Sequence, residues 1–72
     1  MIEIANEEYN YFLEENVYPQ LNINEITEEN VQEVYDFIAD NYEVPMIKNN
    51  DERFMFICGL LSKLSPYLSH KE

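Results

Sequence analysis

Residues that favour turns are concentrated at three places in this chain, and this distribution limits what the chain can fold into. The three places are residues 19–24, residues 45–50 and the Ser65-Pro66 step. Only one glycine occurs, Gly59, so few other positions can bend the backbone sharply. The stretches between the breaks have helical hydrophobic spacing. The sequence therefore predicts an all-α fold, a small three-helix bundle with antiparallel neighbours, in a single domain over residues 1–72.

The first predicted helix, residues 7–17, has a start signal, a buried stripe and a stop signal. Asn6 is a good N-cap because its side chain can accept a hydrogen bond from a free backbone N–H. Pro19 disfavours helix at the residue before it, so the helix is expected to end there. Ile2 and Ile4 are expected to form a short extended lead-in. The apolar residues with helical spacing are Tyr9, Phe12, Leu13 and Val17.

The second predicted helix, residues 28–43, has the clearest pattern. Thr27 is a good N-cap, and Ile26 before it can pack on Val31 as a hydrophobic staple. Pro45 follows the expected end of the helix. The residues that are expected to face the core are Val31, Val34, Tyr35, Ile38 and Tyr42.

The third predicted helix, residues 51–64, is apolar on nearly every side. Asn50 is its expected N-cap. The polar gap on the helical wheel is narrow and consists of Gly59, Ser62 and Lys63. A helix of this kind is normally buried nearly all round, and two short helices cannot cover it. We therefore expect a second copy of the chain, or a partner, on a surface made by Phe56, Leu60 and Lys63.

Charge is distributed very unevenly along the chain. Twelve carboxylates and no lysine or arginine occur before Lys48, and the formal net charge of the chain is −11. Nucleic acid and anionic lipid are therefore not expected as direct partners, because both repel a strongly negative surface. The apolar runs are too short for a membrane span. A lone cysteine and the absence of a signal peptide after Met1 lead us to expect a cytoplasmic protein.

No set of residues in the sequence matches a catalytic, cofactor or metal site. Cys58 lies among apolar residues, where a thiol is inert, and it is expected to be a core cysteine. His70, the only histidine, lies near the end of the chain. The adjacent glutamate pairs diverge by about 100° on a helix and cannot face one substrate. We therefore predict that the protein is not an enzyme and needs neither a cofactor nor a metal ion.

Two groups of acidic and aromatic residues are the candidate partner-binding residues. The first is a row on the second helix, opposite its apolar face and about 21 Å long at ~1.5 Å per residue. It consists of Glu29, Glu33, Asp36, Asp40 and Glu43. The second lies on the first helix and consists of Glu7, Glu14, Tyr11 and Tyr18. Tyrosines beside carboxylates suit arginine-rich partners. Phe37, between the acidic and apolar faces, is either a core-edge residue or an interface anchor.

In size, charge and acidic row, the chain resembles small acidic inhibitors made by phages and mobile elements, anti-CRISPR and other DNA-mimic proteins among them. The resemblance covers Glu3 to Glu43. It implies a protein that binds a basic, nucleic-acid-binding enzyme such as a CRISPR nuclease, with its carboxylates in place of phosphates. The row repeats a charge every ~5 Å, which is comparable with phosphates roughly 6–7 Å apart on one DNA strand.

Two other hypotheses agree with the same residues. A small accessory, antitoxin or immunity protein would bind its partner through the apolar third helix, and its acidity would serve only solubility. A homodimeric domain would use the same helix for a second copy of the chain. In both, the acidic row is the solvated face of an amphipathic helix, which is the commonest role of exposed charge.

Overall fold

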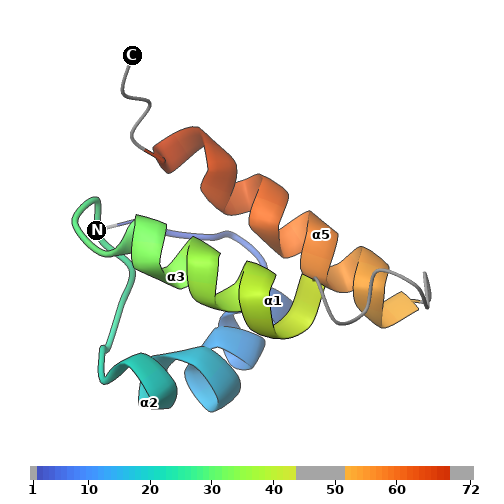
Figure 1. The fold of residues 1–72 in the computed structure, drawn as a ribbon, viewed down its shortest axis with the longest axis horizontal. Helices are drawn as coiled ribbons and strands as arrows, with labels where there is room; N and C mark the ends of the chain where they lie inside the picture. The colour runs from blue at the N-terminus through green and yellow to red at the C-terminus, as the bar shows by residue number, and fades with distance from the viewer. Residues whose placement is uncertain (1, 44–51, 69–72) are drawn as a thin grey trace.

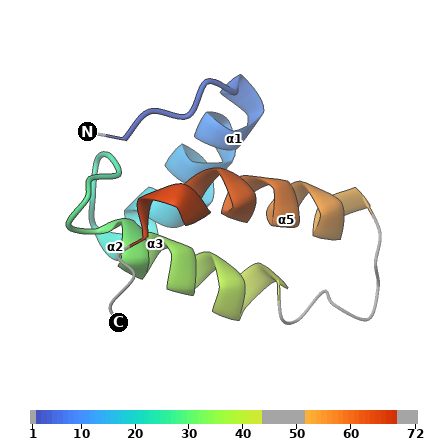
Figure 2. The same cartoon turned by 90° about the horizontal axis from the view of Figure 1, so that it is seen from above.

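Three helical regions make up most of residues 2–43 and 52–68, which are the residues described by the computed structural model (Figure 1). The predicted all-α bundle is confirmed. Helices α3 (Val31–Ile38) and α5 (Glu52–Leu64) lie side by side in opposite directions, and α1 (Glu7–Phe12) and α2 (Tyr18–Leu21) form a helix that crosses this pair (Figure 2). The buried core is formed by Ile2, Ile4, Leu13, Val17, Ile26, Val31, Val34, Ile38, Ile57, Leu60, Leu61 and Leu64.

The start of α1 is capped as the sequence predicts. Asn6 has an extended backbone, with φ −154° and ψ 113°. Its side-chain oxygen accepts hydrogen bonds from the backbone N–H groups of Glu8, at 2.9 Å, and Tyr9, at 3.2 Å. Two donors at the positive end of the helix are thereby satisfied, which stabilises this end.

The first helix continues past Pro19, so the predicted end before this residue is wrong. Residues Leu13–Val17 form a π-helical segment, and the N–H of Tyr18 donates to the carbonyl of Leu13, five residues back. Pro19 follows in the first turn of α2, directly after this segment, and it has no N–H to donate to the preceding turn. The helix ends at Leu21, and Asn22 adopts a left-handed conformation with φ 59°.

The second helix is preceded by a reciprocal cap at Thr27. The hydroxyl of Thr27 accepts hydrogen bonds from the N–H groups of Glu29, at 3.2 Å, and Asn30, at 3.3 Å. In return, the side-chain oxygen of Asn30 accepts from the N–H of Thr27 at 2.8 Å. This arrangement is a capping box with asparagine as the second member. Thr27 therefore makes the capping hydrogen bonds that the sequence predicts, but it makes them to a turn. The predicted helix start at residue 28 is wrong, because residues 28–30 form turns and α3 begins at Val31 after its N-cap residue Asn30.

A second π-helical segment, Ala39–Glu43, extends α3. The same pattern of Phe, aliphatic residue, any residue, acid and Asn occurs at residues 12–16 and 37–41. In each, the asparagine side chain donates to the carbonyl of the phenylalanine, from Asn16 to Phe12 at 3.2 Å and from Asn41 to Phe37 at 2.9 Å. At both π-helical segments, an asparagine amide thus adds a side-chain hydrogen bond to a backbone carbonyl where the helix changes register.

The extended lead-in is confirmed, and it is part of the core. Ile2 forms an antiparallel bridge with Ile26, and its N–H donates to the Ile26 carbonyl at 2.8 Å. Ile2 and Ile4 are both buried. The side chain of Asn10, on α1, donates to the carbonyl of Ile4 at 2.9 Å. The lead-in is therefore held from both ends by hydrogen bonds to the rest of the fold.

The predicted surface of Phe56, Leu60 and Lys63 on α5 is not an exposed apolar surface. Leu60 is completely buried, and the ring of Phe56 packs edge-on against Tyr9 at 4.9 Å and Phe12 at 5.7 Å between ring centroids. Only Lys63 of the three is exposed.

The physical reason is Gly59, which the sequence analysis assigned to the polar gap. The hydroxyl of Tyr9 occupies the position where a side chain at residue 59 would begin. The absence of a side chain there lets α1 cross close to α5, so that Tyr9 and Phe12 pack on Phe56. The exposed large apolar residue on α5 is instead Met55, at 67% exposure. The expected cap at Asn50 lies outside the described residues.

Candidate functional site

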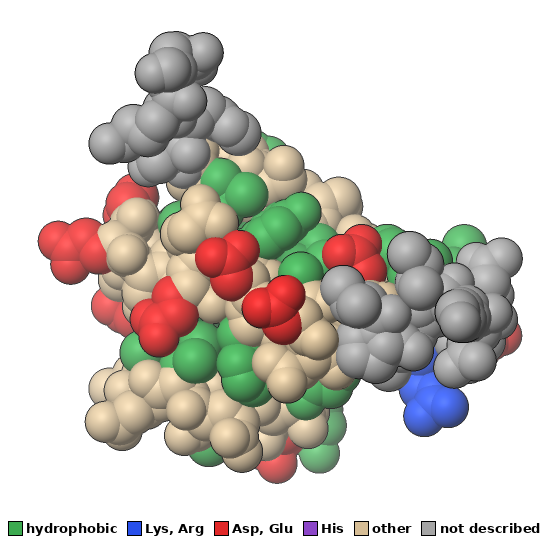
Figure 3. Space-filling view, in the orientation of Figure 1, with side chains coloured by type: hydrophobic (Ala, Val, Ile, Leu, Met, Phe, Trp, Pro, Cys, Tyr) green, Lys and Arg blue, Asp and Glu red, His purple; other side chains and the backbone are tan. Residues whose placement is uncertain are grey.

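Four of the five residues of the predicted acidic row lie together on one face. Glu33 and Asp36 come from α3, Asp40 from the π-helical segment after it, and Glu29 from the turn before it, and all four are exposed. Figure 3 shows acidic side chains gathered over this part of the molecule, with apolar side chains between them.

Glu43, the fifth residue of the predicted row, does not belong to it. Its side chain is half-buried and accepts a hydrogen bond from the thiol of Cys58 on α5, with 3.7 Å between sulfur and oxygen. The wider turns of a π-helix change the angle between residues, so the three-residue step from Asp40 to Glu43 does not return to the same side. The helical part of the row, from Glu33 to Asp40, is then about 10 Å long at ~1.5 Å per residue.

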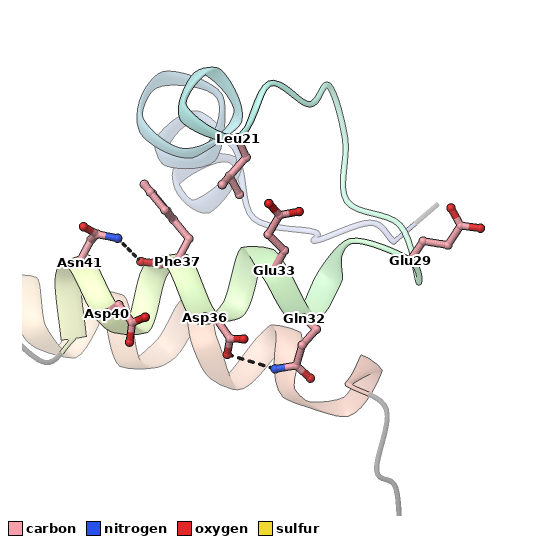
Figure 4. A pocket seen from close by; sticks show the side chains of 8 residues that line it. All are labelled: Leu21, Glu29, Gln32, Glu33, Asp36, Phe37, Asp40 and Asn41. Carbon is pink, nitrogen blue, oxygen red and sulfur yellow. Dashed lines mark hydrogen bonds between the residues drawn. The ribbon is translucent and has the colours of Figure 1, made fainter.

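The row borders an open groove of about 590 Å³ between α2 and α3. Leu21 and Phe37 form its apolar floor, and both are half-buried. In Figure 4, the side chains of Leu21, Glu33 and Phe37 extend into the space between the two helices. The other residues that line the groove are Glu29, Gln32, Asp36, Asp40 and Asn41.

Two amides hold parts of the groove in place. The side chain of Gln32 donates to the Asp36 carboxylate at 3.1 Å, and that of Asn41 donates to the carbonyl of Phe37 at 2.9 Å (Figure 4). Among the described residues, no hydrogen-bond or ion-pair partner is found for Glu33 or Asp40. Neither carboxylate therefore has to lose an internal hydrogen bond before it binds a cation.

Sequence reasoning missed Leu21, Gln32 and Asn41 as members of this site. Leu21 reaches the groove only because the first helix continues past Pro19. Phe37 is a core-edge residue, and its role as an interface anchor stays a prediction. Its ring packs against Tyr42, with 6.4 Å between centroids, and one side of it lines the groove.

The second predicted group divides into two environments. Tyr11 is 67% exposed, and Glu7 and Glu14 are exposed near it on the same helix. Tyr18 is half-buried, and it lines a separate hollow with Glu3, Glu14 and Glu25. Partial burial raises the pKa of the Tyr18 hydroxyl above its ordinary value, and the negative charges of Glu14 and Glu25 raise this pKa further. Glu3 and Glu25, which also line this hollow, were not among the predicted residues.

We expect Tyr18 to make the fold less stable in alkali. In the unfolded chain a tyrosine ionises near pH 10, whereas the raised pKa of Tyr18 keeps the folded chain protonated there. The unfolded state therefore releases its proton first, and the free energy of unfolding falls as pH rises above about 10. Between pH 8 and pH 10.5, the free energy of unfolding measured with urea should fall less for Tyr18→Phe than for the wild type. Tyr11→Phe, at an exposed position, is the control, and an equal effect of both variants would contradict the prediction.

Cys58 is half-buried, which corrects its expected place in the core. Desolvation raises the pKa of its thiol, and the charge and hydrogen bond of Glu43 raise this pKa further. The group is therefore held as a neutral thiol at neutral pH, which is the opposite of what an activated nucleophile requires.

Within residues 2–43 and 52–68, no group of three or more His, Cys, Asp or Glu side chains is placed to hold a metal ion. In the same residues, every buried side-chain nitrogen or oxygen has a hydrogen-bond partner. None of the described helices has both the length and the apolar character needed to cross a membrane. His70 lies outside the described residues. The acidic groove is thus the feature of the described surface with the most distinctive chemistry.

Comparisons with family models, with curated proteins and with solved structures found no match to this chain. Its function must therefore be inferred from its own residues and their geometry.

Proposed function

We propose that this protein is an inhibitor that binds the basic nucleic-acid-binding surface of an enzyme, such as a CRISPR nuclease. The observation that carries the proposal is the row of exposed carboxylates at Glu29, Glu33, Asp36 and Asp40. Residues 1–47 contain no lysine or arginine that could neutralise them. A surface with one sign of charge attracts a partner of the opposite sign and speeds its association.

The spacing of these carboxylates supports mimicry of phosphates. Along α3 and its extension, steps of three and four residues place a charge about every 5 Å. This repeat is comparable with the phosphates of one DNA strand, roughly 6–7 Å apart. Like charges at this spacing destabilise a helix by ~0.2–0.5 kcal/mol per pair. A basic partner would relieve this repulsion, because its lysines and arginines would lie between the carboxylates.

Competition with DNA is the direct test of this proposal. We would measure the binding of labelled target DNA to guide-loaded CRISPR nucleases and to other basic DNA-binding enzymes, with increasing amounts of the protein. For the true target, the apparent Kd for DNA should rise in proportion to the protein concentration. The protein's own affinity for that enzyme should fall at least tenfold between 50 mM and 300 mM salt, because the contacts are electrostatic.

A protein that displaces DNA from none of these enzymes would contradict the proposal. Tight binding that is insensitive to salt would also contradict it, and would favour the alternative in which α5 carries the contact. That alternative now has a smaller apolar surface, because Leu60 is buried and Phe56 is half-buried beneath α1. Met55, at 67% exposure, is the residue that would then be tested.

A further inference from the structure

We propose that the groove between α2 and α3 binds an arginine side chain presented by the protein partner. The inference rests on the proposed function, and it names the chemistry of the contact. The aliphatic part of the arginine would lie on Leu21, its guanidinium would stack on the ring of Phe37, and the carboxylates of Glu33 and Asp40 would pair with it.

The positions of these residues follow from helical geometry. Glu33 and Asp40 lie four residues before and three residues after Phe37, so the two carboxylates are neighbours of the ring on one helix face. Figure 4 shows Leu21 on the facing helix, directed toward the same space. A phenylalanine ring that faces an aliphatic side chain, with carboxylates three and four residues away on the same helix, is a chemically mixed site that a purely solvated helix face does not need.

Arginine suits this mixed site better than lysine does. Its guanidinium is planar and weakly hydrated, so it stacks on an aromatic face while its N–H groups bond to carboxylates. The lysine ammonium is compact and strongly hydrated, so contact with an apolar floor costs it more hydration. Carboxylates alone already favour arginine to some extent, because its N–H groups bond to them in pairs. The ring of Phe37 and the side chain of Leu21 would increase this preference, because they add an apolar surface on which the guanidinium stacks.

The charge of the chain disfavours the other occupants of the groove. A phosphate or a nucleic acid would meet four exposed carboxylates, which repel it. A second copy of the chain carries a net charge of −11 and would be repelled as a whole. A basic protein segment is the partner whose charge complements this surface.

The test compares two peptides of equal charge, hexa-arginine and hexa-lysine, titrated into the 15N-labelled protein at 150 mM salt. We expect hexa-arginine to bind about three- to tenfold more tightly, which is the range of a cation–π contact. The largest shifts of the amide signals should occur at Leu21, Glu33, Phe37 and Asp40. Equal affinities, or shifts spread evenly over all acidic residues, would overturn the inference.

A pair of matched variants identifies the ring responsible. Phe37→Leu keeps an apolar side chain in the groove and removes the ring, so it should clearly reduce the preference for arginine and leave the affinity for hexa-lysine unchanged. Tyr11→Leu removes another exposed aromatic residue beside carboxylates and should keep the preference. The reverse result would overturn the inference. If Phe37→Leu does not fold, the positions of the shifted amide signals in the wild-type protein alone decide whether the groove binds arginine.

The groove and the proposed function can fail separately. Arginine preference at the groove without displacement of DNA from any enzyme would overturn the proposed inhibitor and leave the groove assigned. Displacement of DNA that is unchanged in a folded Phe37→Leu variant would overturn the role of the groove and leave the inhibitor.

Discussion

Replacing Asp36 and Asp40 together with lysine is expected to weaken binding to the basic partner by roughly 2–5 kcal/mol, because like charges then face each other across the interface. The association rate should fall, and the dependence of affinity on salt should become shallower. Both residues are exposed, so the fold should be retained. Surface plasmon resonance against the target enzyme at several salt concentrations would measure each of these effects, with circular dichroism as the check on folding.

The control is a variant with the same change in net charge at another place. Glu3 and Glu15 are exposed and do not line the groove. Their double replacement by lysine should reduce affinity much less, since only the long-range attraction is weakened. If both double variants lose the same affinity, net charge alone governs the association, and the acidic row has no particular role.

Leu60→Ala is expected to lower the free energy of unfolding by about 2–5 kcal/mol, the range for a leucine removed from a packed core. Leu60 is fully buried where α5 packs inside the bundle. For a chain of this size, 1 kcal/mol corresponds to about 4–8 °C in melting temperature, so the melting point should fall by about 8 °C or more. Urea and thermal unfolding, followed by circular dichroism, would measure both quantities.

Met55→Ala is the matched control on the same helix. Met55 is 67% exposed, so its truncation should change the free energy of unfolding by no more than about 0.5 kcal/mol. A small effect at Leu60 together with a large one at Met55 would mean that α5 presents the opposite side to the core. In that case the predicted partner surface of Phe56, Leu60 and Lys63 would have to be considered again.

Several elements of the fold could be read from local sequence because their causes are local. Asn6 and Thr27 are caps whose hydrogen bonds join residues two or three positions apart. The stripe of Val31, Val34 and Ile38 follows from the period of the helix, and all three residues are buried. The acidic row from Glu33 to Asp40 depends on the same period.

The two π-helical segments show where local patterns were not sufficient. Each has a local signature, the repeated Phe to Asn pattern at residues 12–16 and 37–41, but a regular helix also fits these residues. The change of register carries the first helix to Leu21 and turns Glu43 toward Cys58. Both changes decide which residues belong to the candidate site, because the first adds Leu21 and the second removes Glu43.

The sequence by itself therefore determined three helices, the capping residues Asn6 and Thr27, the buried stripe of the second helix and the concentration of negative charge, since each depends on residues within a few positions of one another. Tertiary structure decided which faces remain open. The close approach of Tyr9 to Gly59 lets α1 cover Phe56, and the packing of α2 beside α3 brings Leu21 to Phe37. Such contacts join residues far apart in the chain, and they depend on how whole helices cross, which is set by the shapes of all the packed side chains together.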